Sequence, residues 1–578
     1  STGPGFGILL VALALTLAPA GPLRADWDTD ALDRAVGPGW PGFAHTRALG
    51  PLPASLSFPR TAAFGWTDWL GTGVDPGAAY DVDGSLVALS GPDVSLLAGA
   101  LPLSVGRVAS ASPAERGFVP LDDYPGHFYR APFARVTMSA GDLIEAWSGR
   151  FGRTLRDTTV SLELAGGLRR SDGPDGSGSA ELERFSARVV TETAGGWRVR
   201  ARGLHVGLVR VERFPGFDPA SFSRSVTASA VDVIIEKSDV SLSLLSGSRW
   251  TEDERDGVVR RGDLRLSGAT LGLRGGFLPV DTLTLSAGHL SAGGSLYRDG
   301  EDVWSLEARA ARTVDLRAGD VTVEGGLTRR RGVILPEARV GWTLDSGSRR
   351  FRADALITSR HPSSAELLHA SIPVPTWGGG TRTIEGAGDL DPEGAVAVLL
   401  SALDDAVLSG VGLAVGAARL VDPVRVADGA TRPENGEDET TGSAAAWAEV
   451  GSRAGAGLRA EVQALAAGDE SALHSQMPVP VLAASVEGWF HASFFERDYL
   501  GTRWSVRVVH ETGLARGAWT DLVDDDTTSV DLMVEGEAGS AVMFVALRDA
   551  LESASSAAPS RPAPGRRLEA GFHWDFRG

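Results

Sequence analysis

The chain has 578 residues, a formal net charge of −19 and a sequence pI of about 5.0. This acidic balance argues against general nucleic-acid binding, and the absence of cysteine excludes disulfides, thiolate metal sites and cysteine nucleophiles. The 73 glycines favour strands joined by many turns over long helices.

Residues 1–25 have the features of a signal peptide. An apolar run covers residues 6–21, and Ala18-Pro19-Ala20 fits an A-x-A cleavage site, with Ala25 as a second candidate. The run is short for a transmembrane helix, which needs about 20 apolar residues. A retained N-terminal anchor is the alternative. An exported chain without cysteine suggests a bacterial envelope protein.

Residues 26–130 differ from the rest in their many prolines and glycines and in their short, irregular apolar runs. We expect a small N-terminal region of loops and a few strands there. From residue 131 to 578 the pattern is an alternation of apolar and polar residues, which predicts strands. Phe351, Ala353 and Ile357 share one face of such a run, for example.

The connections between the expected strands are of two kinds. Short ones, such as Asp256-Gly257, predict tight turns between antiparallel neighbours. Longer polar ones cover residues 169–181, 426–443 and 553–565. Together they predict a barrel with one rim of short turns and one rim of long loops.

Residues 394–421 are long and apolar enough to suggest a transmembrane helix instead. However, Asp404 and Asp405 lie in the middle of this stretch. Each charge would cost a membrane helix about 2.5–3.5 kcal/mol, whereas a hairpin can place both at its turn. We therefore favour two strands.

The region from residue 131 holds roughly 18–22 transmembrane strands of about 9–11 residues each. Open twisted sheets rarely exceed about 10 strands, so a sheet of this size must close or split. We therefore predict an all-β fold, a large antiparallel transmembrane β-barrel. Its water-filled lumen would accept the charged face of the strands, including Arg198, Arg200, Arg202, Arg265 and Arg507. Tryptophans near strand ends are expected as a group to form interfacial girdles, with a generic packing role as the alternative for each one alone: Trp197, Trp304, Trp342, Trp447, Trp489 and Trp504.

The last strand, "GRRLEAGFHWDF", resembles the final strand of Gram-negative outer-membrane β-barrels, above all TonB-dependent receptors and plug-less porin-type barrels. Arg566 or Arg567, Gly571, Trp574 and Phe576 match that pattern, and Phe572 lies on the same face as the two aromatic residues. The resemblance implies that Gly571, Phe572, Trp574 and Phe576 form an assembly signal for the barrel-assembly machinery and periplasmic chaperones, and that this strand closes the barrel against the first. It also implies a location in the outer membrane, among lipid and lipopolysaccharide. Arg577 and Gly578 depart from the pattern, in which the aromatic residue is often the last.

Residues 26–130 are similar in part to a receptor plug, through Val82-Asp83-Gly84 and Leu101-Pro102-Leu103 followed by Arg107-Val108. The resemblance implies a degenerate plug; a periplasmic lead-in is the alternative. No clear TonB box and no plug "R-G" motif are present, so TonB as a partner stays an open alternative.

No nucleophile elbow, phosphate-binding loop, dinucleotide fingerprint or zinc-protease motif is present. We therefore expect no enzyme, no cofactor and no metal, with rim residues that converge only in space as the open alternative. His361 and His369 are interpreted as solvated loop residues, and so is the acidic stretch 434–439, for which cation binding is the alternative.

The predicted function is transport of small solutes across the outer membrane. A structural or adhesive barrel with a blocked lumen is one alternative, and a soluble, secreted multi-domain β protein is another.

Overall fold

The computed structural model describes residues 78–80 and 86–89 and most of the chain from 133 to 577. Within that span it does not describe residues 143, 156–158, 173–177, 214–220, 256, 276–279, 297–299, 348, 361–371, 376–380, 405–409, 423, 426–430, 433, 452–454, 468–479, 495–499, 515–526, 540, 549 and 552–565. The expected signal peptide and the boundaries of the N-terminal region lie outside the described residues.

Every regular element in the described part is a β-strand. The strands of the main sheet are β3 (Phe133–Gly141), β4 (Ile144–Thr154), β5 (Val160–Asp172), β6 (Gly178–Glu192), β7 (Arg198–Arg213), β8 (Ser221–Lys237), β9 (Val240–Arg255), β10 (Val258–Arg274), β11 (Thr282–Gly293), β12 (Glu301–Leu316), β13 (Gly319–Arg330), β14 (Val333–Ser346), β15 (Arg349–Arg360), β18 (Glu393–Asp404), β19 (Gly410–Val421), β22 (Glu439–Gly451), β23 (Ala456–Ala467), β24 (Pro480–Phe494), β25 (Leu500–Leu514), β26 (Thr527–Ala538), β27 (Ala541–Arg548) and β28 (Arg567–Arg577).

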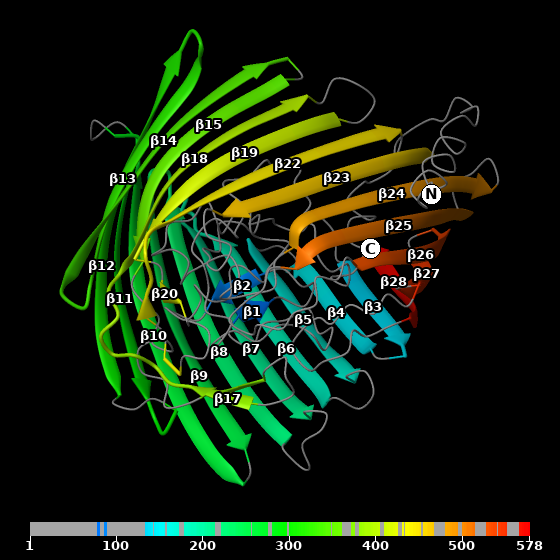
Figure 1. Ribbon diagram of the computed structural model, residues 1–578, viewed down its shortest axis with the longest axis horizontal. Coiled ribbons are helices and arrows are strands. Elements are labelled where there is room, and N and C mark those ends of the chain that lie inside the picture. The colour runs from blue at the N-terminus through cyan, green and yellow to red at the C-terminus, as the bar shows by residue number, and fades with distance from the viewer. Residues whose placement is uncertain are drawn as a thin grey trace.

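These strands form one closed antiparallel barrel, with 22 strands among the described residues (Figure 1). Each strand pairs with its neighbours in sequence order, and the last strand, β28, pairs with the first, β3. At this seam Gly571 lies opposite Ser139 and Trp574 opposite Val136. Closure pairs the backbone of every strand on both sides, as a bilayer requires. The predicted fold class is confirmed, at the upper end of the expected strand number.

The stretch 394–421 forms the predicted hairpin. β18 ends at Asp404 and β19 begins at Gly410, and the two strands pair from Gly394↔Val421 to Asp404↔Val411. Asp404 thus lies at the end of its strand, away from the apolar middle of the span. Among the described residues no helix has the length and apolarity needed to cross a membrane.

The two rims of the barrel differ as the sequence predicted. One, the short-turn rim, carries both ends of the barrel segment, and its longest connection covers residues 275–281. The other, the long-loop rim, has five connections longer than that: 361–392, 422–438, 468–479, 515–526 and 549–566. The first two of these connections contain small two-stranded sheets: β16 (Ile372–Pro375) with β17 (Thr381–Ile384), and β20 (Val424–Arg425) with β21 (Glu434–Asn435).

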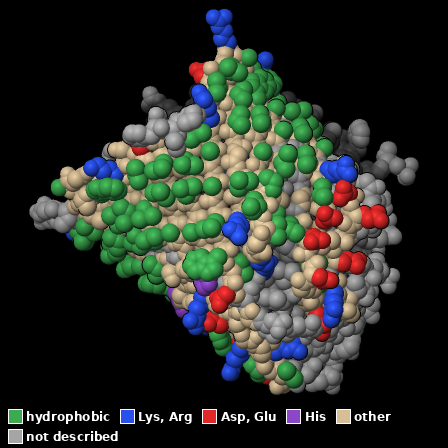
Figure 2. Space-filling model, turned by 90° about the vertical axis from the view of Figure 1, so that its left-hand side faces the viewer, with side chains coloured by type: hydrophobic (Ala, Val, Ile, Leu, Met, Phe, Trp, Pro, Cys, Tyr) green, Lys and Arg blue, Asp and Glu red, His purple; other side chains and the backbone are tan. Residues whose placement is uncertain are grey.

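The outer face of the barrel is apolar and exposed. Phe351 and Ile357 of β15, Val398 and Leu400 of β18 and Val506 of β25 are among its exposed side chains. Figure 2 shows such side chains in parallel rows over one side of the molecule. The apolar rows predicted from the alternation therefore face outward. This is the face that a bilayer would cover.

Most of the expected girdle tryptophans lie on the outside near a rim. Trp197, Trp342 and Trp504 lie near the short-turn rim and Trp304 near the long-loop rim. Trp489 was predicted wrongly, because it faces inward and is only 6% exposed, packed across Gly457 of the neighbouring strand. The side chain of Trp447 is outside the described part.

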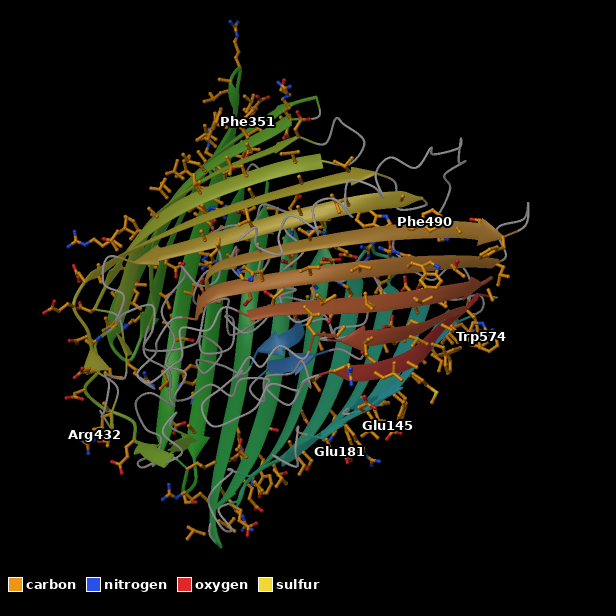
Figure 3. All side chains as sticks on the ribbon, turned by 45° about the vertical axis from the view of Figure 1, so that its right-hand side comes forward. Glu145, Glu181, Phe351, Arg432, Phe490 and Trp574 are labelled. Carbon is orange, nitrogen blue, oxygen red and sulfur yellow. The ribbon has the colours of Figure 1, made fainter. Side chains whose placement is uncertain are left out.

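Two short strands represent the N-terminal region among the described residues. β1 (Ala78–Tyr80) pairs with β2 (Leu86–Leu89), and β1 contacts β7 of the barrel. Figures 1 and 3 both show this pair within the outline of the barrel.

Candidate functional site

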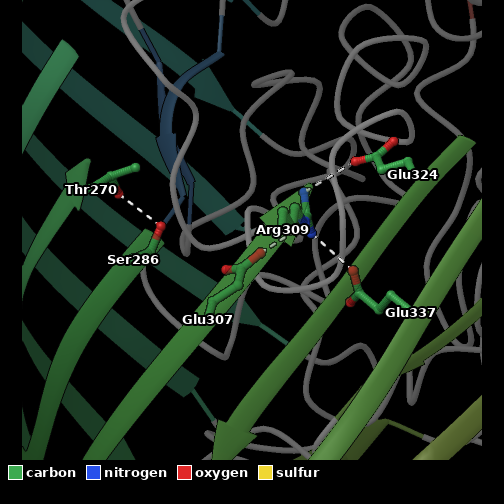
Figure 4. Close-up of polar contacts among 6 residues, drawn as sticks. All are labelled: Thr270, Ser286, Glu307, Arg309, Glu324 and Glu337. Atoms are coloured by element: carbon green, nitrogen blue, oxygen red, sulfur yellow. Dashed lines mark hydrogen bonds and ion pairs between the residues drawn. The ribbon is translucent and has the colours of Figure 1, made fainter. Parts of the chain in front are cut away.

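The inner wall carries its charges in clusters, and one of them surrounds Arg309 of β12 (Figure 4). The Nε atom of Arg309 lies 2.8 Å from a Glu307 carboxylate oxygen, and its Nη2 atom donates a 2.9 Å hydrogen bond to Glu337 of β14. Glu324 of β13 is 3.9 Å from Nη1. One guanidinium therefore ties three neighbouring strands together on the lumen side.

A glycine makes room for this guanidinium. Gly326 of β13 lies directly opposite Arg309 in the strand register, and the next strand places Glu337 opposite the same glycine. A Cβ atom at Gly326 would come within 3.0 Å of the Arg309 side chain. The missing side chain thus leaves the space through which Arg309 reaches across β13 to Glu337.

The cluster continues to the next strand pair. Arg339 of β14 donates two hydrogen bonds, of 3.0 and 2.8 Å, to one oxygen of Asp354 of β15, and Asp354 is nearly completely buried. Gly341 faces Asp354 in the register, as Gly326 faces Arg309. The two arginines and four carboxylates from Glu307 to Asp354 have a formal charge of −2.

A second group of charges lies on β24 to β26. Arg503 is 3.8 Å from Glu535 and 3.9 Å from Glu487, and its guanidinium carbon lies 5.8 Å from the ring centre of Trp489. Glu535 is 1% exposed. Removing charges of this kind from water is costly unless they are paired, so their pairing across strands is needed for the wall to be stable.

A third group lies on β7 and β8, where Arg200 donates a 2.8 Å hydrogen bond to Glu236 and Arg198 lies 3.6 Å from the same carboxylate.

Three of the arginines predicted to face the lumen do so: Arg198, Arg200 and Arg507. Arg265 does not. It lies on the outer face in the half of β10 that leads to the long-loop rim, with its side chain 73% exposed, and pairs with Asp263 at 2.9 Å. The side chain of Arg202 is outside the described part.

Two of the long loops are tied together by Asn435 of β21. Its Oδ1 accepts a hydrogen bond from the Asp391 N–H at 2.8 Å, and its Nδ2 donates to the carbonyl oxygens of Asp391 and Asp422. Within the acidic stretch 434–439, Asp438 pairs with Arg419 at 2.9 Å. No group of three or more His, Cys, Asp or Glu in the described part of the chain could hold a metal ion.

The expected assembly-signal residues lie together on β28. Phe572, Trp574 and Phe576 share its outer face, and the rings of Trp574 and Phe576 stack with centroids 4.2 Å apart near the short-turn rim (Figure 3). Gly571 faces inward, opposite Phe544 of β27. The side chains of His573 and Asp575, and the loop residues His361 and His369, are outside the described part.

Only part of these lumen clusters could be predicted from the sequence. The alternation "VWSLEARA" places Glu307 and Arg309 on one face of a strand. Their partner Glu337 is 28 residues from Arg309, so only the strand register brings it close. The pairing of glycines with large or charged residues across strands follows from the same register.

No family model matches the chain, and no curated protein matches it significantly. Solved structures do match. They include a variant of the ferric enterobactin receptor PfeA of Pseudomonas aeruginosa, with a TM-score of 0.64, 9% identity and coverage of 94% of this chain and 97% of that one. The siderophore receptor PirA of Acinetobacter baumannii has a TM-score of 0.59 at 10% identity, covering 78% of this chain and 81% of its own.

The FrpB iron transporter of Neisseria meningitidis has a TM-score of 0.60 at 10% identity, with 87% and 88% of the two chains covered. At such identities the similarity establishes a shared fold and nothing finer. The chain thus has the barrel fold of these receptors.

Proposed function

We propose that this chain is an outer-membrane β-barrel transport protein that passes or takes up small solutes, either as a receptor of the TonB-dependent type or as a porin-like channel. One observation carries the proposal: a closed sheet of 22 strands has an apolar outer face and a charged inner face. A barrel of this size has a lumen wide enough for a solute path or for a plug. We expect no enzymatic activity.

The alternative of a soluble multi-domain protein does not fit the structure. One closed sheet includes every strand from β3 to β28 except the two small loop sheets, and its outer face would expose a continuous apolar surface to water. A structural or adhesive barrel with a blocked lumen remains the second candidate, because β1 contacts β7 and so could belong to a plug.

We further propose the domain arrangement expected from the sequence: a signal peptide over residues 1–25, a plug-like or periplasmic region over 26–130 and the barrel over 131–578. The names of the similar structures make ferric siderophores the first solutes to test. Energy coupling through TonB is proposed on the same similarity, and the lack of a clear TonB box makes passive passage its competitor.

The proposed assembly partners are the barrel-assembly machinery and periplasmic chaperones. Gly571, Phe572, Trp574 and Phe576 would form the signal that they recognise. Outer-membrane lipid and lipopolysaccharide would surround the apolar face. The outer row Phe572, Trp574 and Phe576 at the closing seam, of which Trp574 and Phe576 are exposed, supports this role, because an incoming strand presents such a row before the barrel closes.

Conductance in planar bilayers tests the function. Opening events in the intact chain would support a channel, whereas conductance that appears only after deletion of residues 26–130 would support a plugged receptor. A barrel that conducts in neither form would favour the structural role. Heat-modifiable migration of the detergent extract checks folding in each case, and a freely soluble monomer would refute the membrane assignment.

A further inference from the structure

Charged residues on the outer face differ between the two rims. Near the long-loop rim, outward arginines lie beside carboxylates: Arg170 pairs with Glu181 at 2.9 Å, Arg261 with Glu252 at 2.8 Å and Arg265 with Asp263 at 2.9 Å. Glu145 lies opposite Arg170 in the register, and Figure 3 shows Glu145 and Glu181 near one edge of the barrel. These three arginines are therefore neutralised by carboxylates of the same rim.

Near the short-turn rim, three outward cations have no such partner among the described residues. Arg153 of β4, Lys237 of β8 and Arg312 of β12 are exposed, and none forms an ion pair with a carboxylate among the described residues. Lys237 lies 5.6 Å from the ring centre of Trp197 in the adjacent turn. Asp281, next to Arg312 across the strands, accepts a hydrogen bond from the Thr313 N–H instead.

Arg153 and Arg312 also have apolar neighbours on the outer face. Arg153 lies between the exposed side chains of Phe151 and Leu155, and Arg312 lies two residues from the exposed Val314 on the same face. A charged head group in such surroundings extends along its apolar stem toward the nearest polar layer. In a bilayer that layer is the phosphate level of the lipid head groups.

We propose that Arg153, Lys237 and Arg312 form a basic girdle that binds the phosphate groups of anionic phospholipids in the leaflet around the short-turn rim. The girdle residues lie on three well-separated strands, so each binds its own lipid head group. This inference rests on the proposed function as a membrane-spanning barrel. It adds the class of lipid that the barrel binds and the leaflet in which that lipid lies. The physical basis of the proposal is the attraction between these cations and the lipid phosphates at the level of the aromatic side chains Trp197 and Trp504.

One substitution at the same rim should have the opposite effect, an increase in lipid binding. Arg349 of β15 is a fourth outward cation at the short-turn rim, and its Nε donates a 2.9 Å hydrogen bond to Asp404. The change Asp404→Asn removes this carboxylate and leaves the Arg349 charge to the lipid. Lipid binding should therefore fall when the girdle charges are removed and rise when Arg349 loses its carboxylate partner.

The test is native mass spectrometry of the full chain purified in detergent and titrated with phosphatidylglycerol or with phosphatidylcholine. The unchanged chain should bind phosphatidylglycerol more tightly. In the combined variant Arg153→Gln, Lys237→Gln, Arg312→Gln this affinity should fall about fivefold at each site, the effect of one elementary charge at an anionic surface. Binding of phosphatidylcholine should not change, and Asp404→Asn should increase binding of phosphatidylglycerol.

Equal binding of the two lipids by the unchanged chain would overturn the proposal, and so would a combined variant that binds phosphatidylglycerol as well as before. Heat-modifiable migration is measured for every sample. A chain that shows none is not a membrane barrel, and that outcome would refute the proposed function itself rather than the girdle.

Discussion

Replacement of Arg309 is the most direct perturbation of the lumen wall. Arg309→Met keeps most of the apolar stem and removes the guanidinium, which is held by Glu307 at 2.8 Å and Glu337 at 2.9 Å. The side chains of Arg309, Glu307 and Glu337 are 7%, 10% and 10% exposed. The variant therefore leaves two nearly buried carboxylates close together without their shared cation.

The expected loss follows from this burial. Breaking a buried ion pair by removal of one partner costs about 3–5 kcal/mol, because the remaining charge stays desolvated. Both carboxylates have further polar interactions, which lower the cost. We therefore expect the free energy of unfolding to fall by about 3 kcal/mol. The same change at Arg265, whose side chain is 73% exposed, should cost no more than about 1 kcal/mol.

Urea unfolding of the reconstituted barrel, followed by tryptophan fluorescence and by gel mobility, measures both variants. A loss below about 1 kcal/mol for Arg309→Met, or equal losses at the two arginines, would refute the account of a buried hub. A third variant separates charge from packing. If Glu307→Gln and Glu337→Gln are added to Arg309→Met, the two nearly buried carboxylates are neutral and only Glu324, whose side chain is 31% exposed, keeps its charge, so most of the stability should return.

Three further predictions concern other parts of the barrel. Gly571→Ala should destabilise the seam by about 1–3 kcal/mol in the same urea assay, because the new Cβ would lie 2.3 Å from the Met138 carbonyl oxygen. Phe576→Ser should lower the yield of heat-modifiable barrel in cells, since it removes half of the stacked pair in the proposed assembly signal. Asn435→Ala should speed limited proteolysis within residues 422–438, because two hydrogen bonds to the neighbouring loop and one within the same loop are lost.

Each of these variants has its own control. Gly203→Ala meets no atom within 4 Å and should be close to neutral, so equal damage at both glycines would contradict the seam argument. Normal assembly of Phe576→Ser would contradict the proposed signal. Asn435→Ala should leave heat-modifiable migration unchanged, and a general loss of folding would show that its role is not confined to the loops.

Much of the fold could be predicted because membrane strands repeat a simple pattern. The alternation in the row from Val486 to Phe494 specified its outward face, and Asp404 with Asp405 specified a hairpin rather than a helix. The same pattern placed Trp489 on the face opposite Phe490, yet its position near a strand end suggested a girdle. Gly457 of the neighbouring strand, which provides the space for the inward ring, is not evident from the sequence around Trp489.

Arg265 shows a different limit. Its strand, β10, has 17 residues, more than the about 9–11 that a bilayer requires. The half of β10 that leads to the long-loop rim, which includes Arg265, extends past the apolar zone, and there the outer face becomes polar as well. Arg265 was predicted to face the lumen because it is a charged residue on a strand, but it lies on the outer face beside Asp263.

The sequence by itself determined the class of fold, the two kinds of rim and the inward and outward faces of most strands, because the side-chain period of a strand is a local property. Only the tertiary structure decided which charges meet. Arg309 reaches Glu337 across Gly326, and Gly571 admits the ring of Phe544 beside the closing seam. These contacts depend on the register of strands that are distant in the chain, and register becomes fixed only when the whole sheet closes.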